Sequence, residues 1–165
     1  MNQGLCGFLL SSLLMASGVH AAAETKETYN VLDLPVLDYK VGFADLWIGK
    51  NVDNNKVLLH NREIQDYLFA HPPSRIRYAI PPGVSTFTAF GIRTAGDSNV
   101  TGTWFYIVKI DGKEAFRSKP LLEYKNYTVP ISVRIPPGAR GIELIIDNMG
   151  NGFADHAIWA LPMFQ

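Results

Sequence analysis

Two stretches of the chain alternate strictly between large apolar residues and other residues. In Arg75-Ile76-Arg77-Tyr78-Ala79-Ile80 a large apolar side chain occupies every second position, with arginines on the other parity. The stretch Ile131-Ser132-Val133-Arg134-Ile135 has the same pattern. Because the side chains of a strand point alternately to its two faces, this period of two predicts strands with an apolar face in the core and a basic face in solvent.

Turn sequences follow both stretches and lead into a second apolar run. Pro81-Pro82-Gly83 separates the first stretch from residues 87–90, and Pro136-Pro137-Gly138 separates the second from residues 142–146. A third unit joins residues 104–110 to residues 113–116 through Asp111-Gly112, a pair typical of two-residue hairpin turns. Each of the three units is therefore predicted to fold as strand, turn, strand.

The rest of the chain fits the same class of fold. After the N-terminal segment, no stretch keeps apolar residues at helical spacing long enough to form a helix. The sequence contains 10 prolines and 14 glycines and is 12% aromatic, which favours many short strands joined by turns. We expect one all-β domain over residues 30–165, an antiparallel two-sheet β-sandwich of the jelly-roll type.

The N-terminal segment has the features of a signal peptide. Residues 1–23 contain no Asp, Glu, Lys or Arg, and their apolar run is too short to span a membrane. Small residues follow this run, so we expect cleavage after Ala21 or Ala23 and a secreted or periplasmic protein. The segment lacks the usual basic residue near its start. Lipidation at Cys6, the only cysteine, is the competing interpretation, although the apolar run follows that cysteine instead of preceding it.

The net charge of the chain and its lack of known catalytic motifs narrow the range of possible functions. The 15 basic and 15 acidic residues give a formal net charge of +0, which disfavours nucleic-acid binding. The chain has no P-loop, no Gly-x-Ser-x-Gly elbow, no His-Glu-x-x-His and no Cys-x-x-Cys motif. Asp147 and Asp155 are candidates for a glycosidase pair, but turn carboxylates are the favoured interpretation because Asp is common in turns. The domain is predicted to be non-catalytic.

The densest group of chemically useful residues lies near the C-terminus and carries a family resemblance. Asp155-His156-Ala157-Ile158-Trp159-Ala160 is similar to the closing Asp-His-Ala-x-Trp-Ala motif of the NPCBM/NEW2 family. Residues 71–78 resemble the family's His-Ala-Pro-Ser segment, and residues 108–113 resemble its Val-x-x-Asp-Gly-Lys hairpin. Residues 87–91 resemble its Phe-x-Ala-x-x-Gly strand, with one residue fewer before the glycine. The four matches occur in the family's order along the chain.

This resemblance implies a fold and a class of ligand. NPCBM domains are carbohydrate-binding modules related to carbohydrate-binding module family 51, with a galactose-binding-domain-like sandwich, so the implied ligand is a galactose-type glycan. Residues 66–70 depart from the family, which has glycines there, and we expect a loop of different shape at this point. This departure raises an alternative, a structural or protein-interaction sandwich without a sugar site.

Five residues are candidates for contacting such a sugar, whose apolar face stacks on aromatic rings and whose hydroxyls pair with polar side chains. Trp47 and Trp159 are candidate stacking platforms. Core packing is the alternative for Trp47 and the favoured interpretation for Trp159, which lies in a strand beside Ile158. His71, Arg75 and His156 are candidate hydroxyl partners. For His71, a buried and hydrogen-bonded imidazole is the alternative.

The sequence also allows predictions about a bound calcium ion and about the binding partners of the domain. Sugar-binding sandwiches of this kind often carry a structural calcium ion, and hard oxygen ligands are offered by Asp147, Asn148, Asn151 and Asp155. No EF-hand spacing is present, and we expect no required cofactor. The expected partners are a carbohydrate and either a separate glycoside hydrolase or a cell-surface glycan, with no nucleic acid and no membrane span.

Overall fold

The computed structural model describes residues 27–50, 56–93, 104–121, 128–148 and 156–165. The signal peptide predicted for residues 1–21, with cleavage after 21 or 23, lies outside these ranges. One helical element occurs within them, the short 3-10 helix Val31–Asp33. None of the described residues belongs to a helix long and apolar enough to cross a membrane.

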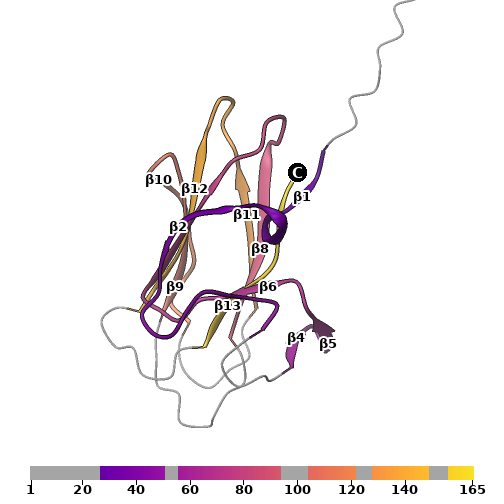
Figure 1. The fold of residues 1–165 in the computed structure, drawn as a ribbon, viewed down its shortest axis with the longest axis vertical. Coiled ribbons are helices and arrows are strands. Elements are labelled where there is room, and N and C mark those ends of the chain that lie inside the picture. The colour runs from indigo at the N-terminus through magenta and orange to yellow at the C-terminus, as the bar shows by residue number, and fades with distance from the viewer. Residues whose placement is uncertain (1–26, 51–55, 94–103, 122–127, 149–155) are drawn as a thin grey trace, which may run out of the picture.

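Two antiparallel sheets form the body of the molecule, and Figure 1 shows them as two layers. The six-stranded sheet has the order β11 (Thr128–Arg134), β8 (Thr86–Arg93), β13 (Ala157–Phe164), β6 (Tyr67–Phe69) and β3 (Trp47–Ile48), with β1 (Tyr29–Asn30) also paired to β13. The five-stranded sheet has the order β10 (Lys113–Arg117), β9 (Phe105–Ile110), β12 (Gly141–Asp147), β7 (Ser74–Ala79) and β2 (Val36–Lys40). The prediction of an all-β two-sheet sandwich is confirmed.

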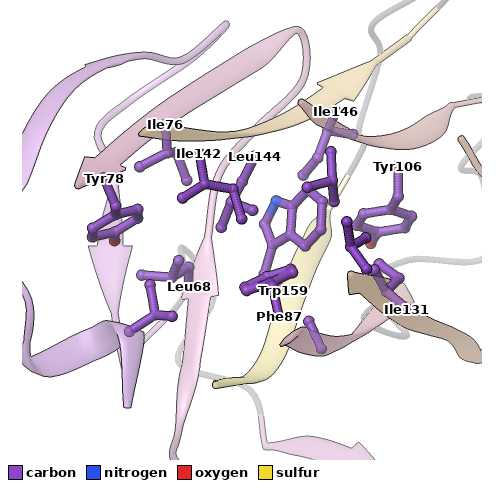
Figure 2. Packing of buried hydrophobic residues seen from close by; sticks show 14 of the residues in the cluster. Leu68, Ile76, Tyr78, Phe87, Tyr106, Ile131, Ile142, Leu144, Ile146 and Trp159 are labelled. Carbon is purple, nitrogen blue, oxygen red and sulfur yellow. The ribbon is translucent and has the colours of Figure 1, made fainter. Parts of the chain in front are cut away.

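The main core lies between the sheets and follows the predicted alternation. Ile76 and Tyr78 on β7 are fully buried, whereas Arg77 between them is exposed. Trp159 of β13 packs edge to face against Tyr106 of β9, with ring centroids 5.0 Å apart, and Figure 2 shows both rings among the buried aliphatic side chains. Burying one such side chain stabilises the fold by about 1.5–3 kcal/mol, so this layer dominates stability.

Tyr106 also ties the two sheets together through its hydroxyl. The phenol donates to the carbonyl oxygen of Ile92 at 2.7 Å and accepts from the backbone N–H of Ile158 at 3.2 Å. Burial raises the pKa of this phenol. A Cβ on Gly91 would lie 2.6 Å from the Tyr106 ring, so only glycine allows β8 to approach it this closely. The glycine of the predicted strand 87–91 therefore has a packing role.

The three predicted turns lie at one end of the sandwich, the upper end in Figure 1. Gly83 and Gly138 have φ values of 81° and 79°, which their lack of a Cβ permits. Asp111 at the third turn also has positive φ, and its carboxylate accepts hydrogen bonds from the backbone N–H groups of Arg140 and Gly141. The turn chemistry read from the sequence is thus confirmed at all three places.

A second, smaller hydrophobic cluster lies on the outer face of the six-stranded sheet. The hairpin of β4 (Val57–Leu59) and β5 (Arg62–Ile64) covers this face and buries Val57 and Leu59 against β6 and β13. Residues 67–69 are accordingly buried on both faces and form β6. The expected loop at residues 66–70 is corrected here: three successive apolar side chains are better accommodated in a strand covered on both sides.

Candidate functional site

The candidate site lies at the end of the sandwich opposite to the three turns. Three segments meet there: residues 41–46 after β2, residues 70–73 between β6 and β7, and His156, which precedes β13. The backbone N–H of Gly42 donates to the carbonyl oxygen of His71 at 2.9 Å, and that of Ala70 donates to Ala157 at 3.4 Å. These bonds bring the three segments, which are distant in sequence, to one place.

Five aromatic rings form a continuous row across this end. Phe43 contacts His71 edge to face at 5.7 Å between centroids, and His71 contacts His156 at 6.2 Å. His156 contacts Phe69 at 5.7 Å, and Phe69 stacks on Trp47 at 5.7 Å with an interplanar angle of 24°. Phe43 is 63% exposed, and Trp47 and His156 are half-buried. The ring row therefore presents aromatic surface to solvent at both of its ends.

The loop that carries Phe43 is packed tightly against residues 70–73. A Cβ on Gly42 would lie 2.3 Å from the carbonyl oxygen of Pro72 and 2.8 Å from Cδ of Pro73. Any other residue at position 42 would force the loop away, since real Cβ contacts are essentially never shorter than 3.0 Å. The peptide bond between Pro72 and Pro73 is cis. Close packing at Gly42 thus places Phe43 beside His71.

Two hydrogen bonds to the side chain of Asp45 hold the same loop, residues 41–46. The Tyr39 hydroxyl donates to Oδ1 of Asp45 at 2.7 Å, and the backbone N–H of Leu46 donates to the same oxygen at 2.8 Å. The bond from Tyr39, with the smaller contribution of Leu46, lowers the pKa of the Asp45 carboxyl. The same bond raises the pKa of Tyr39. The carboxylate form of Asp45 therefore holds the loop that presents Phe43.

Hydrogen bonding also defines the state of His71. Its Nδ1 lies 3.1 Å from the carbonyl oxygen of Pro72. Because a carbonyl oxygen can only accept, Nδ1 carries the proton in this bond, and Nε2 is the acceptor when the ring is neutral. His71 as a whole is 8% exposed, so its orientation is held by its surroundings.

The structure brings together three of the five predicted ligand residues. His71, His156 and Trp47 belong to the ring row, and the Lys50 ammonium lies 5.9 Å from the Trp47 ring centroid. Trp159 is fully buried between the sheets, which agrees with its favoured interpretation as a core residue and corrects its candidacy as a stacking platform. Arg75 lies on the outer face of the five-stranded sheet, where it pairs with Asp38 and, at 3.8 Å, with Glu143.

Phe43 is the site residue that sequence reasoning did not single out. The only signal was a large apolar residue directly after glycine in a segment without strand or helix periodicity. Its neighbour Ala44 has φ of 58°, a left-handed conformation that belongs to the turn. Turn geometry of this kind depends on contacts with residues 70–73, which are remote in sequence.

The predicted calcium ligands are only partly within the described residues. Asp147 is exposed at the end of β12, and Asn148 after it is 7% exposed. Asn151 and Asp155 lie outside the described residues. Within the described ranges, no three His, Cys, Asp or Glu side chains gather as a metal site would require. Calcium binding remains a prediction.

Several solved structures share this fold. A family 51 carbohydrate-binding module of ZmpB from Clostridium perfringens, solved with GlcNAc, matches with a TM-score of 0.73 at 20% identity, over 84% of this chain and 31% of that one. The module from the GH95 protein of the same organism, solved with methyl-galactose, matches with a TM-score of 0.73 at 15% identity, over 84% of this chain and 100% of that one. Tandem modules of a family 98 glycoside hydrolase from Streptococcus pneumoniae match with a TM-score of 0.68 at 22% identity, over 84% of this chain and 46% of that one.

These matches show a shared fold, and the chain spans about a third of the length of the ZmpB structure. No curated protein sequence matches the chain. The model of the NPCBM/NEW2 domain family matches residues 27–165. This range covers both sheets and the ring row, and it confirms the resemblance carried by the four motifs. The chain therefore belongs to the NPCBM/NEW2 domain family.

Proposed function

We propose that the chain is a non-catalytic carbohydrate-binding module that holds a galactose-type glycan at the ring row. The observation that carries this proposal is the row itself, in which exposed Phe43 and half-buried Trp47 flank the two imidazoles of His71 and His156. The methyl-galactose and GlcNAc complexes of the similar modules support a sugar as the class of ligand.

The chemistry of the row suits an uncharged sugar. A pyranose has an apolar C–H face that packs on an aromatic ring, and Phe43 offers such a ring to solvent. Its hydroxyl groups both donate and accept, and an imidazole ring such as those of His71 and His156 can pair with them through a ring nitrogen. Stacking on Phe43 and hydrogen bonding to the imidazoles would together fix the orientation of the sugar.

Calorimetric titration of the protein with methyl-galactoside, and separately with GlcNAc, tests the proposal. We expect binding that Phe43→Ala weakens by about tenfold, which is about 1.4 kcal/mol. His156→Ala should weaken it further by removing a hydroxyl partner. Leu37→Ala is the matched control, because Leu37 is 58% exposed on β2 and takes no part in the ring row.

Two outcomes would contradict the proposal. One is a well-folded protein that binds neither these sugars nor any member of a glycan array. The other is binding that Phe43→Ala and His156→Ala leave unchanged while the fold is intact. A preference for GlcNAc over methyl-galactoside would support a carbohydrate-binding module but would contradict its proposed specificity for galactose-type glycans.

We further propose that the module works outside the cytoplasm, as the composition of residues 1–23 indicates. It would attach a separate glycoside hydrolase, or the protein itself, to a surface glycan. N-terminal sequencing of the exported protein tests this, and a protein that retains Met1 would contradict it. Calcium is tested by sugar titration with and without EDTA.

A further inference from the structure

The rings at the two ends of the ring row belong to a single short segment of the chain. Phe43 and Trp47 are separated by three residues. The segment is fastened on either side of them, because the backbone N–H groups of Gly42 and Gly49 donate to carbonyl oxygens within residues 67–71, both at 2.9 Å. Both rings are therefore held in place before a ligand binds, which lowers the entropic cost of binding.

Only the ends of the ring row offer a ring face for stacking. Within the row, Phe69 and His71 are 1% and 8% exposed, and half-buried His156 has a ring on either side of it. Phe43 is 63% exposed, and Trp47 stacks on Phe69 and is itself half-buried. Because a pyranose stacks with its C–H face on an accessible ring, sugar units can stack at Phe43 and at Trp47 only.

One sugar unit cannot stack on both of these rings. Three rings lie between them in the row, and among the described residues no ring contact joins Phe43 directly to Trp47. The two rings also have different surroundings, because Phe43 lies against the segment between β6 and β7, whereas Trp47 packs on the outer cluster of the six-stranded sheet. Four residues of chain span at most about 14 Å, so both rings are within reach of a short oligosaccharide.

Polar groups lie between the two rings and beside them. Asp45 stands between Phe43 and Trp47 in the sequence and is exposed; its Oδ1 accepts two hydrogen bonds, and its Oδ2 has no hydrogen-bond partner among the described residues. The exposed ammonium of Lys50 lies 5.9 Å from the Trp47 ring centroid. Sugar hydroxyls both donate and accept, so they can pair with the carboxylate and with the ammonium.

We propose that the ring row has two subsites and binds a glycan of at least two units, with a galactose-type unit stacked on Phe43 and the adjoining unit stacked on Trp47. This inference rests on the proposed function and adds the length of the ligand to it. A monosaccharide occupies the Phe43 subsite alone. In a longer glycan the first unit presents the second to Trp47 at a high effective concentration, so the two weak contacts reinforce each other.

Calorimetric titration with sugars of one, two and three units tests the length of the site. The probes are methyl-galactoside, N-acetyllactosamine, which joins galactose to GlcNAc, and galactotriose. We expect the tighter of the two longer sugars to bind at least about tenfold more strongly than methyl-galactoside.

Variants at Trp47 assign this advantage to the second subsite. Trp47→Leu should remove it and leave the affinity for methyl-galactoside within about twofold of the parent, whereas Trp47→Phe keeps a ring and should retain most of the advantage. Ile48→Ala is the matched control, because Ile48 is 47% exposed next to Trp47 and takes no part in the ring row. The amide NMR spectrum shows whether each variant is folded.

The indole of Trp47 reports directly on the second sugar unit. The chain has 3 tryptophans, and the other two, Trp104 and Trp159, are fully buried. In 15N spectra the Trp47 indole N–H signal is identified by its absence from Trp47→Phe. We expect this signal to shift with the longer sugars and to stay in place with methyl-galactoside, a difference that a purely structural role of Trp47 would not produce.

Three results would overturn the second subsite while leaving the proposed glycan module intact. The first is equal affinity for all three sugars, each still weakened by Phe43→Ala. The second is a folded Trp47→Leu protein that loses affinity for methyl-galactoside as well, which would place both rings on one sugar unit. The third is an advantage of the longer sugars that survives Trp47→Leu. Absence of binding to every sugar would instead overturn the proposed function, and this inference with it.

Discussion

Replacement of Gly42 by alanine tests how the candidate site is held together. The added Cβ would meet the carbonyl oxygen of Pro72 at 2.3 Å, its carbonyl carbon at 2.7 Å and Cδ of Pro73 at 2.8 Å. None of these atoms belongs to the end of a flexible side chain. The loop of residues 41–46 must therefore retreat by more than half an ångström, or the clash must be absorbed by the backbone.

The expected size of the effect follows from these contacts. Overpacking of a tight contact costs about 1–3 kcal/mol, and loss of the hydrogen bond from Gly42 N–H to the His71 carbonyl costs about 0.5–1.5 kcal/mol. If the loop stays in place and keeps this hydrogen bond, we expect Gly42→Ala to reduce the free energy of unfolding by about 1–3 kcal/mol through overpacking. If the loop retreats, the loss of stability is smaller, but Phe43 separates from His71 and sugar affinity falls by about tenfold.

Urea denaturation and calorimetric sugar titration of the same preparation measure both outcomes. Gly141→Ala is the matched control, because its Cβ would lie 3.6 Å from Asp111 Oδ1, an ordinary van der Waals contact. We expect the free energy of unfolding of Gly141→Ala to lie within about 0.5 kcal/mol of that of the parent protein. A Gly42→Ala protein with unchanged stability and unchanged affinity would refute the argument that close packing at position 42 positions Phe43.

Three further predictions concern other parts of the fold. Trp159→Ala should reduce the free energy of unfolding in urea by about 3–5 kcal/mol, because it empties a fully buried site in the core; a change below about 1 kcal/mol would contradict that placement. Tyr78→Phe should leave stability at neutral pH within about 1 kcal/mol, because the buried hydroxyl has no hydrogen-bond partner among the described residues. Burial raises the pKa of Tyr78 from 10.0 to about 12, so its neutral phenol stabilises the fold fully below pH 10, and this stabilisation is lost as the pH rises toward 12. Urea denaturation at both pH values should show that Tyr78→Phe loses less stability at alkaline pH than the parent does. An equal loss in both proteins would refute the raised pKa of Tyr78. Asp45→Asn should lower the pKa of Tyr39 toward its ordinary value, because the bond to Asp45 is the largest cause of its upward shift; phenolate absorbance measures this. In the parent protein the pKa of Asp45 is lower in the folded than in the unfolded state. The hydrogen bonds to the Asp45 carboxylate therefore stabilise the fold at pH values above the unfolded-state pKa, and this stabilisation is lost as the pH falls through the folded-state pKa. We expect sugar affinity to decline in the same acidic range.

Strands with one wet face could be read directly from the sequence. On β7 and β11 the alternation of Ile, Tyr or Val with Arg and Ser matches the burial, and it also placed Arg75 on the solvent face, away from the ring row. Strands buried on both faces carry no such signal. Trp159 lies in the run Ala157-Ile158-Trp159-Ala160, all of it buried, so periodicity could not show which side of β13 its indole occupies.

The same physical limit explains residues 66–70 and the site itself. Tyr67 and Phe69 stand where the family has glycines, and a loop of different shape was expected there. The strand could not be predicted because the hairpin that covers these side chains is a separate segment, residues 57–64. Phe43 could not be identified because its exposure follows from packing at Gly42, not from its own neighbours in sequence. His71 and His156 were candidates from their motifs, but their contact at 6.2 Å depends on how β6 and β13 pair.

The hairpin of β4 and β5 has a consequence for recognition, although it carries none of the proposed sugar contacts. Phe69 is a member of the cluster beneath the hairpin, Trp47 packs against that cluster, and the same two rings form one end of the ring row. Under the proposed function, Trp47 therefore does not have to be ordered when a sugar binds, because the entropic cost of fixing its indole is already met during folding. Substitutions at Val57 or Leu59 that loosen the cluster would weaken sugar binding by restoring that freedom, so affinity can be tuned from the back of the sheet without altering a single contact residue.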